Sequence, residues 1–415
     1  MTPPPIRSAF REPIPSESWR IGGGVIWLVS ASLFFLPFSK TLSEAGWVLA
    51  VLAWIFLQIK SKKLFSRPDA LGCAYFLFLV CVLVSLMQAG PGMTPTAWRG
   101  VWKWFKYLAI FWMCRGLLAH PKNQKLVVFT LLLSMTLASL NGLWQMWNGV
   151  DLISGYSVDI PGRLIRMRGS FGSPNDLAAF YLIALPLAFQ VWLNKKKWSY
   201  PSVSLAGMSA LFFVGLILTL SRSALLALCT AVFIYLVVSR KKRALVIGAL
   251  FLAMFLSFSG IARENFVTSL NTKNITVGER LRTWRQSWEI IKEKPLLGHG
   301  ANTYYREFAA HAPADQEYRG YAHNFVLQIW SDLGLVGLSL FLFALFYGFL
   351  RQWPGKKTAP EFAALWVGLL AFVFQGSLDT NFFAFQTSHL FWVFWGILCS
   401  DGLISPSKKE AGNLA

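Results

Sequence analysis

The stretch "YRGYAHNFVLQIWSDLGLVG", residues 318–337, places one histidine at the start of a long apolar run. The run begins after His323 and Asn324 and continues to about residue 350. A helix that crosses a bilayer needs roughly 20 apolar residues. This segment is therefore expected to span a membrane, with a titratable side chain at its entrance.

The composition of the whole chain also indicates a membrane protein. The 415 residues are 55% hydrophobic, with a mean hydropathy of +0.49. The net charge of +20 could indicate a nucleic-acid partner. We expect none, because the basic residues lie in short clusters between apolar runs, as they do in membrane proteins. The five cysteines all lie within apolar runs, so no disulfide framework is expected.

The apolar runs predict an all-α, polytopic integral membrane protein with about twelve transmembrane helices. The expected spans are residues 21–39, 43–59, 70–88, 101–118, 126–147, 175–194, 203–221, 223–239, 244–260, 324–350, 361–378 and 384–402. As domains, residues 1–260 would hold helices 1–9, 261–323 one long loop, 324–403 helices 10–12, and 404–415 a tail.

The connecting loops alternate between basic and non-basic, which predicts their orientation. One alternate set, which includes both tails, holds more than half of the 39 lysines and arginines. The positive-inside rule places this set in the cytoplasm. The N-terminus is Pro-rich and polar with no cleavage site after the first apolar run, so we expect a cytoplasmic tail rather than a signal peptide. The long loop and His323 are then expected on the outer side.

The predicted outer side carries arginines, although it should be poor in basic charge. The loop "PGRLIRMRGSFGSPND" contains Arg163, Arg166 and Arg168. Arg222 lies in a short turn between two apolar runs and is predicted close to or inside the bundle, where a buried arginine costs about 2.5–3.5 kcal/mol. Any of these could simply contact lipid phosphate. The planar guanidinium is also the side chain best suited to grip a pyrophosphate.

An amphipathic helix is predicted inside the long loop, in "TVGERLRTWRQSWEIIKEKPLLGHG", residues 276–300. Thr276 and Glu279 form a capping box at its start, and Pro295 ends it. One face is apolar: Leu281, Trp284, Trp288 and Ile291. Another face is charged: Arg282, Arg285, Glu289 and Lys292. Such a helix could lie against the bundle or the membrane interface and hold its arginines near the surface.

His323 is the predicted general base. A neutral imidazole accepts a proton, and nearby positive charge favours that neutral form. The alternative is a histidine that only anchors the helix at the interface. Asp379, at the end of a span, could orient neighbouring groups, and Asp332 could be functional or a structural partner. His389 is expected to be a core residue. No set of side chains has metal-ligand spacing, so no catalytic metal is expected.

Three stretches resemble known motifs. Residues 279–304 hold an Arg-x-x-x-Trp pattern and a Pro-Leu-hydrophobic-Gly turn. Residues 322–338 open a helix with His-Asn, and residues 166–181 hold Arg-x-Gly followed by Pro-Asn. Together they resemble the O-antigen ligase family, within the superfamily of bacterial polysaccharide polymerases and ligases. His299 departs from the pattern, because a small or aliphatic residue is usual there, and it could be a second outer base.

This resemblance implies a GT-C-like membrane glycosyltransferase with its site on the periplasmic side of the bacterial inner membrane. It would transfer a glycan from undecaprenyl pyrophosphate to a hydroxyl of the lipid A–core oligosaccharide, completing lipopolysaccharide, without nucleotide or cofactor. Its other partners would be membrane lipids. The family histidine corresponds to His323, and two family arginines correspond to Arg280 and Arg168.

The predicted site therefore consists of His323 as base, with Asn324 and Asp379 supporting it. The predicted pyrophosphate-binding residues are Arg168, Arg222, Arg280, Arg166 and Arg285. Three alternatives remain open. Two lie in the same class, an O-antigen polymerase and a protein O-oligosaccharyltransferase. The third is a transporter or flippase for lipid-linked sugars, although no internal repeat is seen.

Overall fold

The computed structural model describes residues 16–61, 69–158, 165–195, 199–238, 275–311, 320–355 and 358–400. Over these ranges the chain is almost entirely α-helical and forms no β-strand. The predicted span at 244–260 lies outside the described residues, as do Arg163 and the C-terminal tail at 404–415.

Each of the other predicted spans coincides with a helix. These helices are α1 (Ser16–Phe35), α2 (Lys40–Lys60), α3 (Ala70–Val84) with the 3-10 helix η1 (Ser85–Gln88), α4 (Thr94–Leu117), α5 (Pro121–Asn148), α6 (Pro174–Leu193), α7 (Tyr200–Leu218), α8 (Arg222–Val238), α13 (Phe325–Arg351), α14 (Pro360–Gly376) and α15 (Phe385–Leu398). Two further helices, α11 (Ile275–Glu293) and α12 (Tyr304–His311), belong to the long loop.

Six of the described helices are long and apolar enough to cross a membrane: α2, α3 continued by η1, α5, α6, α7 and α13. Shorter apolar segments lie at Gly23–Phe35, Arg222–Val237 and Pro360–Gly376. The predicted fold class, an all-α polytopic membrane protein, is confirmed. The predicted number of about twelve spans and the division into domains stay predictions.

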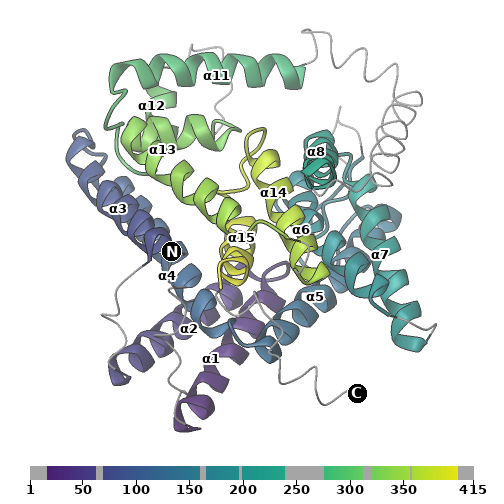
Figure 1. Cartoon of the computed structure of the whole chain (residues 1–415). Coiled ribbons are helices and arrows are strands. Elements are labelled where there is room, and N and C mark those ends of the chain that lie inside the picture. The colour runs from purple at the N-terminus through teal and green to yellow at the C-terminus, as the bar shows by residue number, and fades with distance from the viewer. Residues whose placement is uncertain are drawn as a thin grey trace.

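Helix α15 lies in the middle of the bundle, next to α4, α6 and α14 (Figure 1). Every residue from Gln386 to Leu398 is buried. A helix that is apolar on all sides must be covered all round, by protein or by lipid. In α15 the cover is protein, and Trp392 stacks against the rings of Tyr107 on α4. The short turn before α15 is thereby fixed against the core.

Helix α11 lies across one end of the bundle, above α12 and the start of α13 (Figure 1). The turn after α11 inserts into a break in α13 at Gly334, whose φ is +68°. A Cβ there would lie 2.1 Å from the carbonyl oxygen of Leu296, so the approach requires glycine. The carboxylate of Asp332 accepts the backbone N–H of Tyr304 at 2.9 Å. The backbone carbonyl oxygen of Asp332 accepts the N–H of Gly300, also at 2.9 Å. Asp332 therefore has a structural partner in this turn.

The inner face of α11 agrees only in part with the predicted apolar face. Ile291 is buried as predicted, together with Thr283, Ser287 and Ile290, whereas Leu281 and Trp288 are 39% and 44% exposed. The buried face includes hydroxyl side chains because the helix packs through a hydrogen bond as well as apolar contact. The Ser287 hydroxyl lies 2.7 Å from the hydroxyl of Tyr304 on α12. The predicted charged face is confirmed as exposed, and the helix ends at Glu293, two residues before Pro295.

Candidate functional site

His323 lies at the entrance of α13 in a left-handed backbone conformation, with a φ of +50°. For a residue with a Cβ this costs about 1–2 kcal/mol and persists only where the surroundings impose it. On one side, Asn324 caps α13, and its side chain accepts the N–H of Val326 at 2.9 Å. On the other side, the carbonyl oxygen of Ala322 accepts the indole N–H of Trp284 at 3.0 Å. The position of the imidazole is therefore fixed from both directions.

The Arg-x-x-x-Trp spacing on α11 has a structural reason. Arg280 and Trp284 are four residues apart, so they lie one turn apart on the same face. While Trp284 holds the carbonyl next to His323, the guanidinium of Arg280 reaches the carboxylate of Asp379 at 3.6 Å. One helix therefore positions both the loop that carries the histidine and a cation beside it.

Asp379 is the buried centre of the site. One carboxylate oxygen lies 3.4 Å from Nδ1 of His323 and also accepts the N–H of Thr380 at 2.9 Å. The other accepts the side-chain amide of Asn175 and faces Arg280. Burial alone would raise the pKa of Asp379, but the hydrogen bond from His323 and the charge of Arg280 outweigh it and hold the pKa below 3.8. The ionised carboxylate can only accept, so in this contact Nδ1 of His323 is the donor, and Nε2 is the ring nitrogen that points away from Asp379's hydrogen bond.

Arg166 joins the same network through Asn175. Its guanidinium donates to the side-chain oxygen of Asn175 at 2.8 Å and to the carbonyl oxygen of Thr219 at 2.8 Å. Burial lowers the pKa of Arg166, the charge of Asp379 raises it, and the charges of Arg280 and Arg222 lower it. Arg280 and Arg222 are therefore both close enough to Arg166 to act on it electrostatically.

We call this network the Asp379 cluster; its members are Asp379, His323, Arg280, Asn175 and Arg166. Arg222, the first residue of α8, is near enough to act on Arg166 electrostatically. Arg222 was predicted close to or inside the bundle. Its side chain is exposed between the buried residues Ser221 and Ser223, so it lies at the edge of the bundle rather than inside it.

Two predicted arginines lie apart from the Asp379 cluster. The guanidinium of Arg168 stacks on Tyr156 at 4.5 Å and donates to the carbonyl of Gly172 at 3.4 Å. Its buried Nε has no hydrogen-bond partner among the described residues. Arg285 is exposed on α11. Five residues after Arg280, it points about 140° round the helix from that residue.

The other histidines of interest lie elsewhere. His299 is 3% exposed, with Nε2 at 2.9 Å from the carbonyl oxygen of Ile290, so it supports the packing of α11. His389 is fully buried in α15, and its Nδ1 lies 2.6 Å from the carbonyl oxygen of Phe385. The structure therefore places His389 in the core, as expected. Within the described ranges, no group of three or more His, Cys, Asp or Glu side chains could hold a metal ion.

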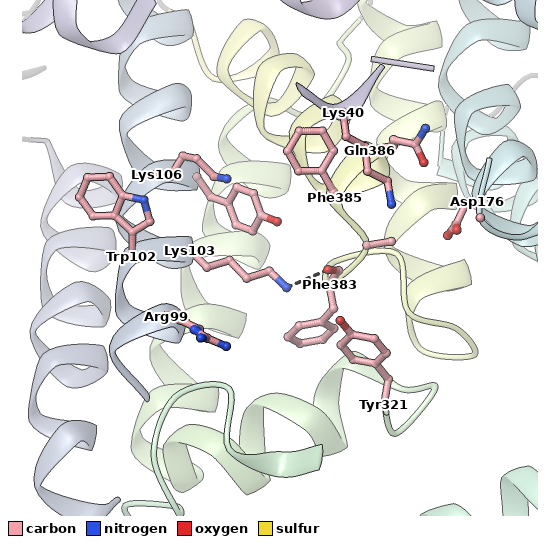
Figure 2. A pocket seen from close by; sticks show the side chains of 13 residues that line it. Lys40, Arg99, Trp102, Lys103, Lys106, Asp176, Tyr321, Phe383, Phe385 and Gln386 are labelled. Carbon is pink, nitrogen blue, oxygen red and sulfur yellow. Dashed lines mark hydrogen bonds between the residues drawn. The ribbon is translucent and has the colours of Figure 1, made fainter. Parts of the chain in front are cut away.

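A cavity of about 450 Å³ adjoins the Asp379 cluster. It is lined by Tyr321, two residues before His323, and by Gly172 and Asp176 on either side of the Ser173–Asn175 turn. Its remaining lining residues are Lys40, Arg99, Trp102, Lys103, Lys106, Tyr107, Phe383, Ala384, Phe385 and Gln386. Figure 2 shows Arg99, Lys103 and Lys106 directed from one helix into this space. We call the cavity with its four basic side chains the cationic cavity.

These basic residues were not among the predicted site residues, because positive charge was sought in the loops and not within the helices. A readable signal was present, because Arg99, Lys103 and Lys106 recur at i, i+4 and i+7, the spacing of one helical face. Asn175 lay within a recognised motif but was not singled out, and only its contacts with Arg166 and Asp379 assign it to the site.

Two comparisons with known proteins concern the family of the chain rather than the geometry of the site. A protein of Rickettsia prowazekii (strain Madrid E), which carries the provisional name polysaccharide ligase, is 29% identical over 164 residues. The aligned part is 36% of this chain and 39% of that relative, so the chain spans about two fifths of the length of the curated relative it matches. The model of the family described as O-antigen ligase matches residues 206–342, which include Arg222, Arg280 and His323. The resemblance inferred from the motifs is thereby confirmed: residues 206–342 are similar to the O-antigen ligase family.

Proposed function

We propose that this chain is an O-antigen ligase of the bacterial inner membrane. It transfers a glycan from undecaprenyl pyrophosphate to a hydroxyl of the lipid A–core oligosaccharide, on the periplasmic side. The observation that carries the proposal is the buried Asp379, which joins a histidine and a guanidinium in one unit. A base and an anion-binding group side by side are what such a transfer needs.

In this proposal the guanidiniums receive the lipid pyrophosphate. Arg280 and Arg166 are each held by a hydrogen bond or an ion pair within the Asp379 cluster, and Arg222 adds its charge from the start of α8. Preorganised cations stabilise the negative charge that develops on a departing pyrophosphate, and they need no rearrangement during the reaction. Arg168 lies apart from the cluster, and its buried Nε–H, without a hydrogen-bond partner among the described residues, is a further donor for the lipid-linked substrate.

His323 acts as the general base. Its Nε2 takes the proton from the acceptor hydroxyl while Asp379 stabilises the imidazolium through Nδ1. The acceptor oxygen forms a bond to the anomeric carbon, and the bond from that carbon to the pyrophosphate oxygen breaks. The electron pair leaves with the pyrophosphate. Direct displacement inverts the anomeric configuration. The pyrophosphate bond supplies the activation, so the step uses no nucleotide and no metal ion.

The orientation in the membrane is part of the proposal. The basic loops predict both termini in the cytoplasm and His323 on the periplasmic side. A cysteine introduced at exposed Lys40 would test this, because a membrane-impermeant maleimide should label it in intact spheroplasts. A cysteine at Lys122, on the predicted cytoplasmic side, should be labelled only after the membrane is opened. The reverse pattern would rule out a periplasmic site.

The transfer itself is tested with purified protein reconstituted in nanodiscs. Given lipid-linked glycan and lipid A–core acceptor in the presence of EDTA, it should form the ligated product. Product formed only on a growing glycan would identify a polymerase, and product formed only on a protein acceptor would identify a protein O-oligosaccharyltransferase. Movement of the lipid-linked glycan across proteoliposomes without transfer would identify a flippase.

A further inference from the structure

The cationic cavity is a second positively charged region, and its basic side chains come from other helices than the one that carries Arg280 of the Asp379 cluster. Lys40 opens α2, and Arg99, Lys103 and Lys106 belong to α4. Asp176 is the one carboxylate in the lining, against four basic side chains. Lys106 is paired with Glu44 at 2.6 Å, outside the lining, and Lys103 donates to the carbonyl oxygen of Phe383 at 2.7 Å. The cavity therefore has an excess of positive charge.

Aromatic rings make up much of the remaining wall. The ammonium of Lys103 lies 5.3 Å from the ring centroid of Phe383, and that of Lys106 lies 5.4 Å from the ring of Phe385. Trp102, Tyr107 and Tyr321 complete this lining. Flat apolar ring faces beside ammonium groups suit a ligand that has both C–H surfaces and a negative charge. A sugar that bears a phosphate has both.

The chemistry of the two regions differs. The Asp379 cluster offers guanidiniums, whose planar forks suit a pyrophosphate. The cationic cavity offers mainly ammonium groups, those of Lys40, Lys103 and Lys106 beside one guanidinium, that of Arg99, and each ammonium is a compact charge with three rotatable donors. Its volume of about 450 Å³ lies within the range of about 300–1,000 Å³ typical of small-molecule sites, so it suits a sugar unit rather than a whole polysaccharide.

The position of the cavity points to the acceptor side of the reaction. Tyr321 lines it two residues before His323, and Phe383 lines it four residues after Asp379. The loops that carry the base and its carboxylate therefore also form the cavity wall. Resting on the proposed ligase function, we infer that the cationic cavity binds a phosphorylated sugar of the acceptor glycolipid, which brings the neighbouring hydroxyl to His323.

The test neutralises the two exposed cations of the cavity, Lys40→Gln together with Arg99→Gln, which leaves the partly buried Lys106–Glu44 pair intact. The matched control is Lys122→Gln with Lys125→Gln on α5, which removes the same charge from exposed positions outside the cavity. Binding to protein in nanodiscs is measured without donor. The probes are lipid A–core glycolipid, the same glycolipid after removal of its phosphates, and undecaprenyl pyrophosphate.

The cavity variant should bind the phosphorylated glycolipid about tenfold or more weakly than the wild type, and the control variant should not. The dephosphorylated glycolipid should bind both variants and the wild type alike, and undecaprenyl pyrophosphate should be unaffected. Unchanged binding of the phosphorylated glycolipid would overturn the inference, and so would weakening confined to undecaprenyl pyrophosphate. Because binding is measured without transfer, wild-type protein that makes no product would refute the ligase proposal alone.

Discussion

The Asp379 cluster and the cationic cavity both gather positive charge, but they hold it in different ways. In the cluster, one arginine comes from a loop and the other from α11, and both are organised around one buried carboxylate. In the cavity, most of the cations project from one face of α4 among aromatic rings. The first arrangement fixes a few donors for one anion, whereas the second leaves room for a ligand. This contrast suggests separate places for donor and acceptor.

The largest effect is expected at His323. Changing His323→Asn removes the base but keeps a residue that tolerates the left-handed backbone. The turnover rate should fall by about 10²- to 10⁴-fold, with thermal stability close to that of the wild type. The control His311→Asn, on α12, removes a histidine outside the Asp379 cluster and should leave the rate unchanged. Full activity of the His323 variant would show that the base lies elsewhere.

The next largest effect is expected for Asp379→Asn. The amide of Asn carries no negative charge to stabilise the imidazolium of His323 through Nδ1–H, so the turnover rate should fall about 100-fold. Since the pKa of Asp379 is held below 3.8, the native carboxylate stays ionised between about pH 5 and 8, and its ion pairs are lost only as the pH falls further.

If the turnover rate of the wild type falls with decreasing pH while the pH is still above about 5, the group that takes up the proton is therefore not Asp379. This fall is the acid limb of the rate profile. If that group is His323, loss of the neighbouring negative charge disfavours the imidazolium. The limb should then move to lower pH in Asp379→Asn. An acid limb at the same pH in Asp379→Asn and in the wild type would show that Asp379 does not interact with the general base, against the proposed role of the Asp379 cluster.

Arginine-to-lysine changes compare the two kinds of cation directly. Arg166→Lys keeps the charge but loses the fork that joins Asn175 and Thr219, so the rate should fall about tenfold. Arg285→Lys on exposed α11 is the matched control and should change the rate less than about twofold, within the range of ordinary surface substitutions. Equal losses in both would mean that the contacts of Arg166 do not mark the donor site.

The smallest effect is expected for Asn324→Ala. Its side chain caps α13 through the N–H groups of Val326 and Leu327, so the loss should cost about 1 kcal/mol of stability. The transfer rate should fall only a few-fold. Asn324→Ser, which keeps a capping oxygen, should restore the stability measured by thermal unfolding. A large loss of rate at unchanged stability would instead place Asn324 against substrate.

The sequence predicted the helices and the cluster better than the cavity, for a physical reason. Long apolar runs and caps such as Asn324 are local signals, and the Arg-x-x-x-Trp motif places Arg280 by helical spacing alone. For Arg222 the sequence left two positions open, close to the bundle or inside it, because a short turn between apolar runs does not fix which way its middle residue points. Lys103 was overlooked because positive charge was sought in loops, although its spacing from Arg99 and Lys106 is that of one helical face.

The most direct test of the account is the binding of undecaprenyl pyrophosphate to variants of the Asp379 cluster in nanodiscs. In the proposed mechanism the guanidiniums bind the pyrophosphate and the histidine transfers the proton. Arg280→Gln should therefore raise the dissociation constant about tenfold or more, while His323→Asn should leave it within about twofold of the wild type. Wild-type affinity in Arg280→Gln, or an equal loss in both variants, would contradict that division of roles.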